Sequence, residues 1–221
     1  MGLILNGRAE DPPSRWLWLF KWLLLVPHYI VLLFLWLAFF VLTVVAYLAV
    51  LFTGRYPRGI FDFNVGVLRW NWRVNYYGYG ALGTDGYPPF SLADDPSYPA
   101  RLTMDYPDRI ANWRPLVQWL LAVPHIVIVT ALTSGPAIAS YGNDTDPTSR
   151  TTASIGIFGT LVLVLALGQL FTGKRLTGVY DLLLGINRWS YRTVAYVALM
   201  TDEYPPFRLD QGDDAAEPSR E

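Results

Sequence analysis

The chain has 221 residues, of which 52% are hydrophobic and only 16% are charged, whereas a typical soluble domain carries about 25% charged residues. The formal net charge of −1 gives no basic surface that would indicate nucleic-acid binding. Cysteine is absent, which excludes disulfides, thiolate nucleophiles and cysteine-based metal sites. We therefore expect an all-α integral membrane protein with no nucleic acid among its partners.

One uncharged apolar run dominates the first third of the chain. It covers about residues 16–52, and no Asp, Glu, Lys or Arg occurs between Lys21 and Arg55. A bilayer span needs roughly 20 apolar residues. A straight helix over this run would be about 55 Å long, against a hydrocarbon core of about 30 Å. The run is too long for one upright span.

Two arrangements resolve this excess length. The first, which we expect, is a hairpin of two short spans over about residues 16–52 that turns near residues 33–38. The second is an interfacial helix up to Val26, a bend at Pro27, and one steep span over residues 29–52.

The sequence contains two similar copies in tandem. Three blocks recur in one order: WLWLFKWLLLVPH from Trp16 returns as WRPLVQWLLAVPH from Trp113, LFTGRYPRGIFDFNVGVLRWNWR from Leu51 returns as LFTGKRLTGVYDLLLGINRWSYR from Leu170, and TDGYPPFSL from Thr84 returns as TDEYPPFRL from Thr201. We expect a tandem duplication with a pseudo-twofold relation between the halves.

The second copy contains an insertion, SGPAIASYGNDTDPTSRTTAS, that interrupts its apolar run. Gly-Pro and the Asn/Asp/Ser/Thr cluster are turn and loop residues. The second repeat therefore reads as two spans, at about 113–132 and 155–171, joined by a polar loop. The two repeats are expected to occupy residues 1–97 and 98–209.

Charge placement predicts four spans with both termini in the cytoplasm. Basic residues flank both apolar regions. They are Arg8, Arg15 and Lys21 before the first, Arg55, Arg58, Arg69 and Arg73 after it, Arg101, Arg109 and Arg114 before the second, and Lys174, Arg175, Arg188 and Arg192 after it. The expected tip of the second hairpin carries Asp144, Asp146 and only Arg150. The expected location is the cell inner membrane.

An amphipathic helix is expected after each apolar region, at about 59–82 and 178–199. Each region ends in Phe-Thr-Gly, and the glycines Gly54 and Gly173 suit the left-handed position that closes a helix. The polar side of these helices carries two equivalent sets, Asp62, Arg69 and Arg73 in the first copy and Asp181, Arg188 and Arg192 in the second. These sets predict either a lipid-headgroup or anion site in the interface or structural ion pairs on helices packed against the spans.

Short extended segments are expected outside the helices. Residues 101–106 alternate in the manner of a strand, and residues 2–8 hold the equivalent place before the first apolar run, so the two can pair in a small sheet. The final segment, residues 210–221, is acidic, has no large apolar residue, and is expected to be disordered.

The only two histidines, His28 and His125, occupy the same place in each copy, in Val-Pro-His. Two symmetry-related imidazoles could ligate haem b from both sides or bind a metal. The alternative is structural: proline removes a backbone donor and kinks the helix, and each histidine satisfies a freed carbonyl or lies near the headgroups. No carboxylate lies inside the expected spans to relay protons.

No nucleophile, Walker loop, HExxH, GxSxG or dinucleotide motif is present. The repeated Thr-Asp-x-Tyr-Pro-Pro-Phe, at residues 84–90 and 201–207, reads as a rigid turn capped by Thr or Asp. We therefore expect no enzymatic activity.

The repeated blocks WLLLVPHYIVL, LFTGRYPRGIFDFNVGVLRWNWRV and TDGYPPFSL resemble the domain-of-unknown-function 4389 family, small membrane proteins found largely in actinobacteria. The resemblance extends over about residues 16–209 in two copies, and the second copy departs from it at residues 175–177, at 182–183 and by its insertion. It implies a membrane location and a repeat, and no catalytic residues.

These observations predict a non-enzymatic inner-membrane protein that serves as an accessory or scaffold for lipids or membrane-protein partners. A bis-histidine haem or metal carrier is the first alternative, and a small transporter or channel along the repeat axis is the second. The sequence leaves homo-oligomerisation open.

Overall fold

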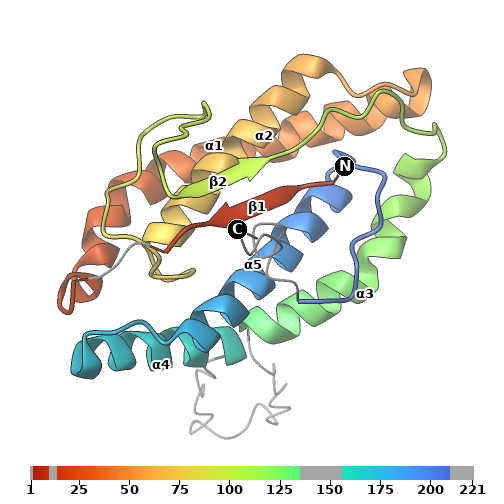
Figure 1. Ribbon diagram of the computed structural model, residues 1–221. Helices are drawn as coiled ribbons and strands as arrows, with labels where there is room; N and C mark the ends of the chain where they lie inside the picture. The colour runs from red at the N-terminus through yellow and green to blue at the C-terminus, as the bar shows by residue number, and fades with distance from the viewer. Residues whose placement is uncertain (1, 10–13, 135–155, 210–221) are drawn as a thin grey trace, which may run out of the picture.

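The computed structural model describes residues 2–9, 14–134 and 156–209 (Figure 1). In chain order its elements are β1 (Ile4–Gly7), a 3-10 turn (Leu17–Leu19), α1 (Lys21–Thr53), α2 (Arg58–Tyr77), β2 (Ala100–Thr103), α3 (Arg114–Ser134), α4 (Ile157–Thr172) and α5 (Thr177–Val197). The fold is mostly helical, as expected. The expected acidic tail 210–221 and the expected hairpin tip with Asp144, Asp146 and Arg150 lie outside the described residues.

The two strands mark the axis that relates the repeats. β1 and β2 pair antiparallel, and Leu5 faces Leu102 in the register. These two leucines hold the same place in the repeats, because both lie 11 residues before the repeated tryptophans Trp16 and Trp113. A pseudo-twofold axis therefore passes between them, and the predicted strand pair and duplication are confirmed.

The first apolar run forms one helix, so the predicted hairpin with a turn near residues 33–38 is wrong. α1 is continuous over 33 residues, with Pro27 inside it, and at 1.5 Å per residue it is about 50 Å long. Pro27, the place of the bend in the alternative arrangement, lies within this helix and does not end it. The physical reason is that residues 33–38 contain no glycine, proline or polar cluster that would leave the helix, whereas α2 packs along α1 and supports it.

The second repeat divides the equivalent of α1 into two helices. α3 carries the block that matches the start of α1, and α4 carries the block that matches its end. In Figure 1, α4 continues away from the end of α3 and does not fold back beside it, so the expected hairpin of the second copy is also wrong. Gly54 and Gly173 end α1 and α4 with φ of 67°, which confirms the expected left-handed caps.

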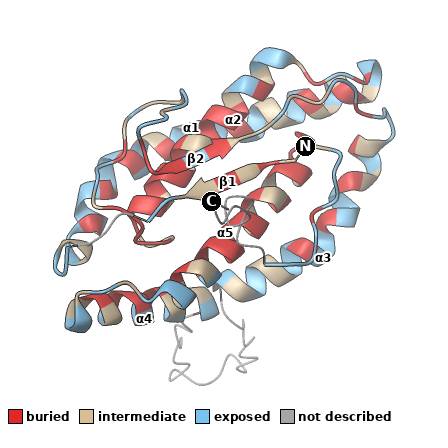
Figure 2. Ribbon diagram, viewed as in Figure 1, coloured by how far each residue is buried: buried red, intermediate tan, exposed pale blue. Residues whose placement is uncertain are grey.

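The molecule has three layers. In Figure 1 the sheet lies in front of α2 and α5, and Figure 2 shows that these two helices carry much of the buried core. α1, α3 and α4 form the layer behind them. At the centre of the core, the rings of Trp72 and Tyr191, which occupy equivalent positions in the repeats, lie 5.7 Å apart. These rings and the buried Leu5 and Leu102 lie around the axis.

Candidate functional site

Each histidine lies in an aromatic box built by its own repeat. His28 of α1 is fully buried and accepts a hydrogen bond at Nδ1 from the indole Nε1 of Trp70, at 3.0 Å. The ring of Phe90 stacks on the imidazole at 3.9 Å between centroids, and the ring of Tyr87 lies at 4.9 Å. The Tyr-Pro-Pro-Phe segment, expected only to form a turn, thus supplies two walls of this box.

The second repeat builds the same box around His125. Its Nδ1 accepts from Trp189 Nε1 at 2.9 Å, Phe207 stacks at 4.1 Å, and Tyr204 lies at 4.7 Å. His125 is also fully buried. The two boxes share no wall, and no ring contact joins His28 to His125 among the described residues.

This geometry does not fit the haem or metal alternative. An indole N–H can only donate, so Nδ1 of each histidine must hold a lone pair and the proton of the neutral ring must lie on Nε2. A protonated Nε2 cannot ligate a metal. The described residues hold no cluster of three or more His, Asp or Glu side chains suited to a metal ion. We infer a structural role for His28 and His125, but the partner of each imidazole is a tryptophan indole at Nδ1 and not the freed carbonyl that was expected, and Nε2 has no partner among the described residues.

The Thr-Asp-x-Tyr-Pro-Pro-Phe segments are fixed to the apolar helices by equivalent contacts. Lys21, buried at the start of α1, donates to the carbonyl of Thr84 at 2.7 Å and pairs with Asp85 at 3.0 Å. At the equivalent position in α3, the buried Gln118 donates to the carbonyl of Thr201 at 2.9 Å. Each segment therefore closes its box by fastening to the first turns of the helix that carries the histidine.

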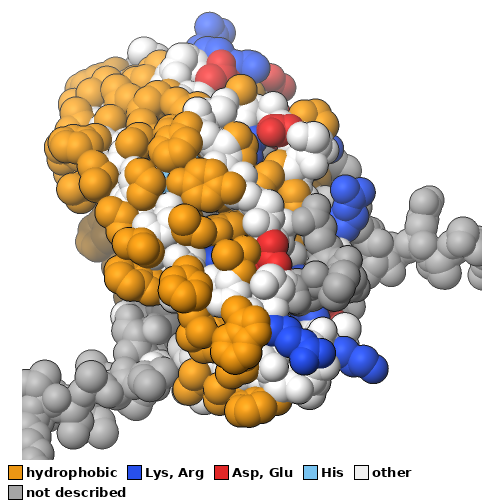
Figure 3. Space-filling model, turned by 90° about the vertical axis from the view of Figure 1, so that its left-hand side faces the viewer, with side chains coloured by type: hydrophobic (Ala, Val, Ile, Leu, Met, Phe, Trp, Pro, Cys, Tyr) orange, Lys and Arg blue, Asp and Glu red, His pale blue; other side chains and the backbone are white. Residues whose placement is uncertain are grey.

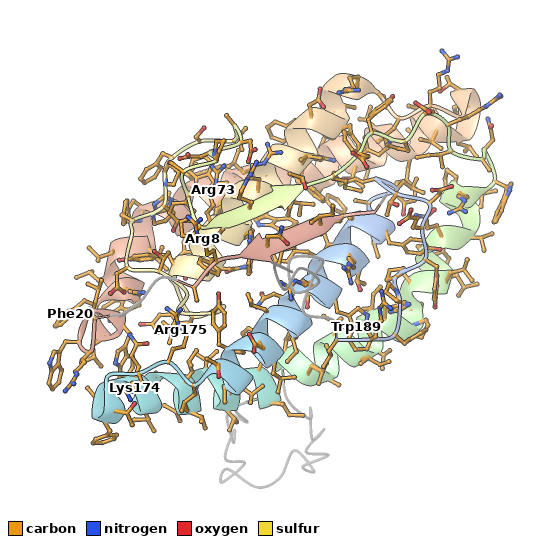
Figure 4. The ribbon with its side chains drawn as sticks, in the orientation of Figure 1. Arg8, Phe20, Arg73, Lys174, Arg175 and Trp189 are labelled. Atoms are coloured by element: carbon orange, nitrogen blue, oxygen red, sulfur yellow. The ribbon has the colours of Figure 1, made fainter. Side chains whose placement is uncertain are left out.

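The predicted arginine sets are divided by the structure. Arg69 points to β2, and Arg73 points to the linker that precedes β2, as Figure 4 shows for Arg73. Arg69 Nε donates to the carbonyl of Leu102 at 3.1 Å, and Arg73 donates to those of Ser91 and Ala93 at 3.1 and 2.6 Å. Arg73 is fully buried. Burial, together with the neighbouring Arg69, lowers its pKa, yet a guanidinium stays protonated in proteins.

The remaining members make other contacts. Asp62 is exposed and pairs with Arg58 at 3.2 Å, one turn before it in α2. Arg188 is buried and donates to the carbonyl of Leu5 at 2.9 Å, while Asp181 and Arg192 are half-buried. Three of the four predicted arginines, Arg69, Arg73 and Arg188, therefore donate to backbone carbonyls inside the fold.

Asp94 completes the polar cluster on the sheet side. Its carboxylate accepts from Arg101 at 2.8 Å and lies 3.7 Å from Arg69. Partial burial acts to raise the pKa of Asp94, but the hydrogen bond from Arg101 and the charges of Arg101, Arg69 and Arg73 outweigh it and lower the pKa below its usual value.

The opposite side of the molecule is an apolar face, formed by the exposed hydrophobic side chains of α1, α3 and α4. Leu33 is 68% exposed, Phe40 67% and Leu116 63%. Figure 3 shows hydrophobic side chains gathered on the side that lies behind the helices in Figure 1, with most of the visible charged side chains at the top or on the other side. By length and composition, α1 and α3 are able to cross a membrane.

The comparisons with known proteins identify a family. A family model described as "Domain of unknown function (DUF4389)" matches residues 15–91 and 152–208. The second match begins at the end of the insertion and so leaves out α3. No curated protein and no solved structure matches the chain. The two matched regions agree with the two copies read from the sequence, and the chain belongs to the DUF4389 family.

Proposed function

We propose that this chain is a non-enzymatic membrane-associated protein that lies along one leaflet with its apolar face in the lipid. The observation that carries the proposal is the exposed side of α1. Between Trp22 and Phe52 the exposed residues of α1 form one continuous stripe without a charged side chain. Soluble monomers rarely expose a contiguous apolar patch larger than a few hundred Å², and large contiguous apolar surfaces mark interaction with a membrane or a partner.

The position of the charges favours helices that lie in the plane of the membrane. The sheet layer, with Asp94, Arg101 and Arg69, lies beside the helices at about the middle of their length (Figure 1). If α1 stood upright across the bilayer, this layer would be immersed in hydrocarbon, where charged side chains are costly. With α1, α3 and α4 lying flat, the apolar face contacts acyl chains and the sheet faces water.

The duplication supports the same orientation. The pseudo-twofold axis between Leu5 and Leu102 passes through the layers, so an axis along the membrane normal presents both repeats to the lipid in the same way. Basic residues at the ends of the apolar helices, Arg55 after α1 and Lys174 after α4, are exposed and suit anionic headgroups. The function that we propose is that of an accessory or scaffold, whose sheet side is free to receive membrane-protein partners.

Flotation with vesicles of phosphatidylethanolamine and phosphatidylglycerol tests this proposal. The purified chain should float with the vesicles after the detergent is removed, and Leu33→Glu combined with Phe40→Glu should release it. The matched control is Arg101→Glu on the sheet side, which should float like the unchanged chain. A chain that remains monodisperse in water without lipid would contradict the membrane proposal, and robust substrate turnover without partners would contradict the non-enzymatic one.

A further inference from the structure

A groove runs along the apolar face between α1 and α3, over a floor made by α2 and α5. It consists of two hollows. One, of about 580 Å³, is lined by α1, α3 and α5, and the other, of about 420 Å³, also reaches α2 and α4. Both are lined by Ser190 and Val194, so they join there. Each lies within the roughly 300–1,000 Å³ of ordinary ligand pockets.

The two hollows are equivalent places in the two repeats that have diverged in chemistry. Tyr29 and Asn75 line the smaller hollow, and their equivalents Ile126 and Val194 line the larger. Phe158 of the smaller hollow and Phe39 of the larger also hold equivalent positions in the repeats. The duplication thus placed one apolar and one polar hollow end to end.

The polar hollow holds a fixed hydrogen-bonding cluster. Trp36 Nε1 donates to Asn71 Oδ1 at 3.2 Å, which fixes that amide so that its Nδ2 donates to the hydroxyl of Tyr191 at 2.6 Å. Asn75 Nδ2 donates to the same hydroxyl at 3.0 Å. The hydroxyl oxygen therefore accepts two bonds. Its own proton and the Oδ1 of Asn75 have no partner among the described residues and are available to a ligand.

We propose that this groove binds a long-chain lipid with an uncharged head that bears a hydroxyl or carbonyl group, its chain in the larger hollow and its head at Asn75 and Tyr191. Among the described residues that line either hollow there is no Asp, Glu, Lys, Arg or His. A charged head would be left there without a partner, which is costly away from water. A bare hydrocarbon would leave the amide and the hydroxyl unsatisfied.

The proposal rests on the proposed function, because the leaflet supplies the ligand to a groove that opens on the apolar face. Polar groups are costly in contact with acyl chains. For this reason the cluster lies on the floor of the groove, on α2 and α5, and not on the exposed stripe of α1. Acyl chains of bulk phospholipid that fill the groove without selection are the competing outcome.

The test is photolabelling of the full chain in detergent micelles with 1-hexadecanol that carries a diazirine on its chain. We expect saturable labelling, mapped by peptide mass spectrometry to the α1 and α3 walls of the larger hollow. Unlabelled 1-hexadecanol should compete at least tenfold better than hexadecanoate or hexadecane. Labelling that does not saturate, or that all three compounds compete equally, would overturn the proposal.

Two variants make the test specific. Asn75→Val installs the residue that the other repeat carries at this position and should weaken labelling about tenfold, the loss expected for one hydrogen bond in an apolar site. Asn6→Val, the same change in β1, should leave labelling unchanged. Ser190→Leu fills the junction of the hollows and should abolish labelling, whereas Val45→Leu on the exposed side of α1 should not. If neither groove variant alters labelling, the proposal is wrong.

The flotation of the same samples separates the two proposals. If the unchanged chain floats but is not labelled saturably, only the groove proposal falls. If it is labelled selectively but does not float, the groove proposal stands and the membrane proposal falls.

Discussion

Replacement of Trp70 by phenylalanine tests the structural assignment of the histidines. Trp70→Phe removes the indole N–H that donates to the fully buried His28 Nδ1 at 3.0 Å. A buried acceptor left without a partner costs about 1–3 kcal/mol, and the smaller ring costs about 1 kcal/mol more in lost packing. We expect a loss of about 2–4 kcal/mol in the free energy of unfolding.

The assay is urea unfolding in detergent, followed by circular dichroism. Trp189→Phe, the same change in the second box, should cost a similar amount because the contacts of His125 are equivalent. Trp70→Phe combined with His28→Leu should be less destabilising than the sum of the two single changes, since both polar partners are then removed. A single-variant cost below about 0.5 kcal/mol, or full additivity in the double variant, would refute the reasoning.

Three further results are expected. Arg73→Met should lower the free energy of unfolding by about 2–3 kcal/mol and expose the linker at 91–94 to proteolysis, because the charge-assisted hydrogen bonds to the carbonyls of Ser91 and Ala93 are lost. Unchanged proteolysis would contradict this. Leu5→Ala and Leu102→Ala should each cost about 2–5 kcal/mol, measured by the same unfolding assay, and should be non-additive because the residues face each other. The pKa of Asp94 is lowered in the folded state, so its contribution to stability is present above its unfolded pKa of about 3.9 and is lost as the pH falls through the folded value. Asp94→Asn should therefore reduce the fall of the unfolding midpoint with decreasing pH in this range. An unchanged fall would contradict the assignment.

Patterns with a direct physical cause were readable from the sequence. The glycines after each Phe-Thr could be assigned to left-handed caps, because Gly54 and Gly173 follow apolar runs and tolerate positive φ. The strand pair could be predicted from alternation and from the equivalent place of the two segments in the repeats. The repeat itself needs no structure, since three blocks recur in order.

The course of the apolar helices could not be read in the same way. The hairpin expectation assumed upright spans and therefore divided a run that was too long for a bilayer, yet a helix that lies beside α2 has no such length limit. The insertion at 134–154 was correctly placed between two helices, but a break in a long helix and a hairpin tip have the same sequence signature.

The chemistry of the polar residues depended on partners remote in sequence. Arg73 and Arg188 read as surface residues of amphipathic helices, because only the fold reveals that a linker and β1 cover them. The histidine boxes use Trp70 and Trp189, 42 and 64 residues away from His28 and His125. Trp70 and Trp189 recur at equivalent positions in the two copies, as does the Tyr-Pro-Pro-Phe segment. This shared repetition was the signal that could have identified the walls.

The depth of α1 in a bilayer tests the central claim most directly. The chain has no cysteine, so a nitroxide can be attached to single cysteines that replace Leu23, Leu33, Val41 and Leu48 on its exposed stripe. Collision rates with oxygen and with a water-soluble nickel chelate then report the depth of each label in vesicles. The first and last sites are about 37 Å apart along the helix. We predict one common shallow depth for all four labels, with a label at position 101 in water, whereas a depth that peaks in the middle of α1 and falls toward both ends would contradict the account.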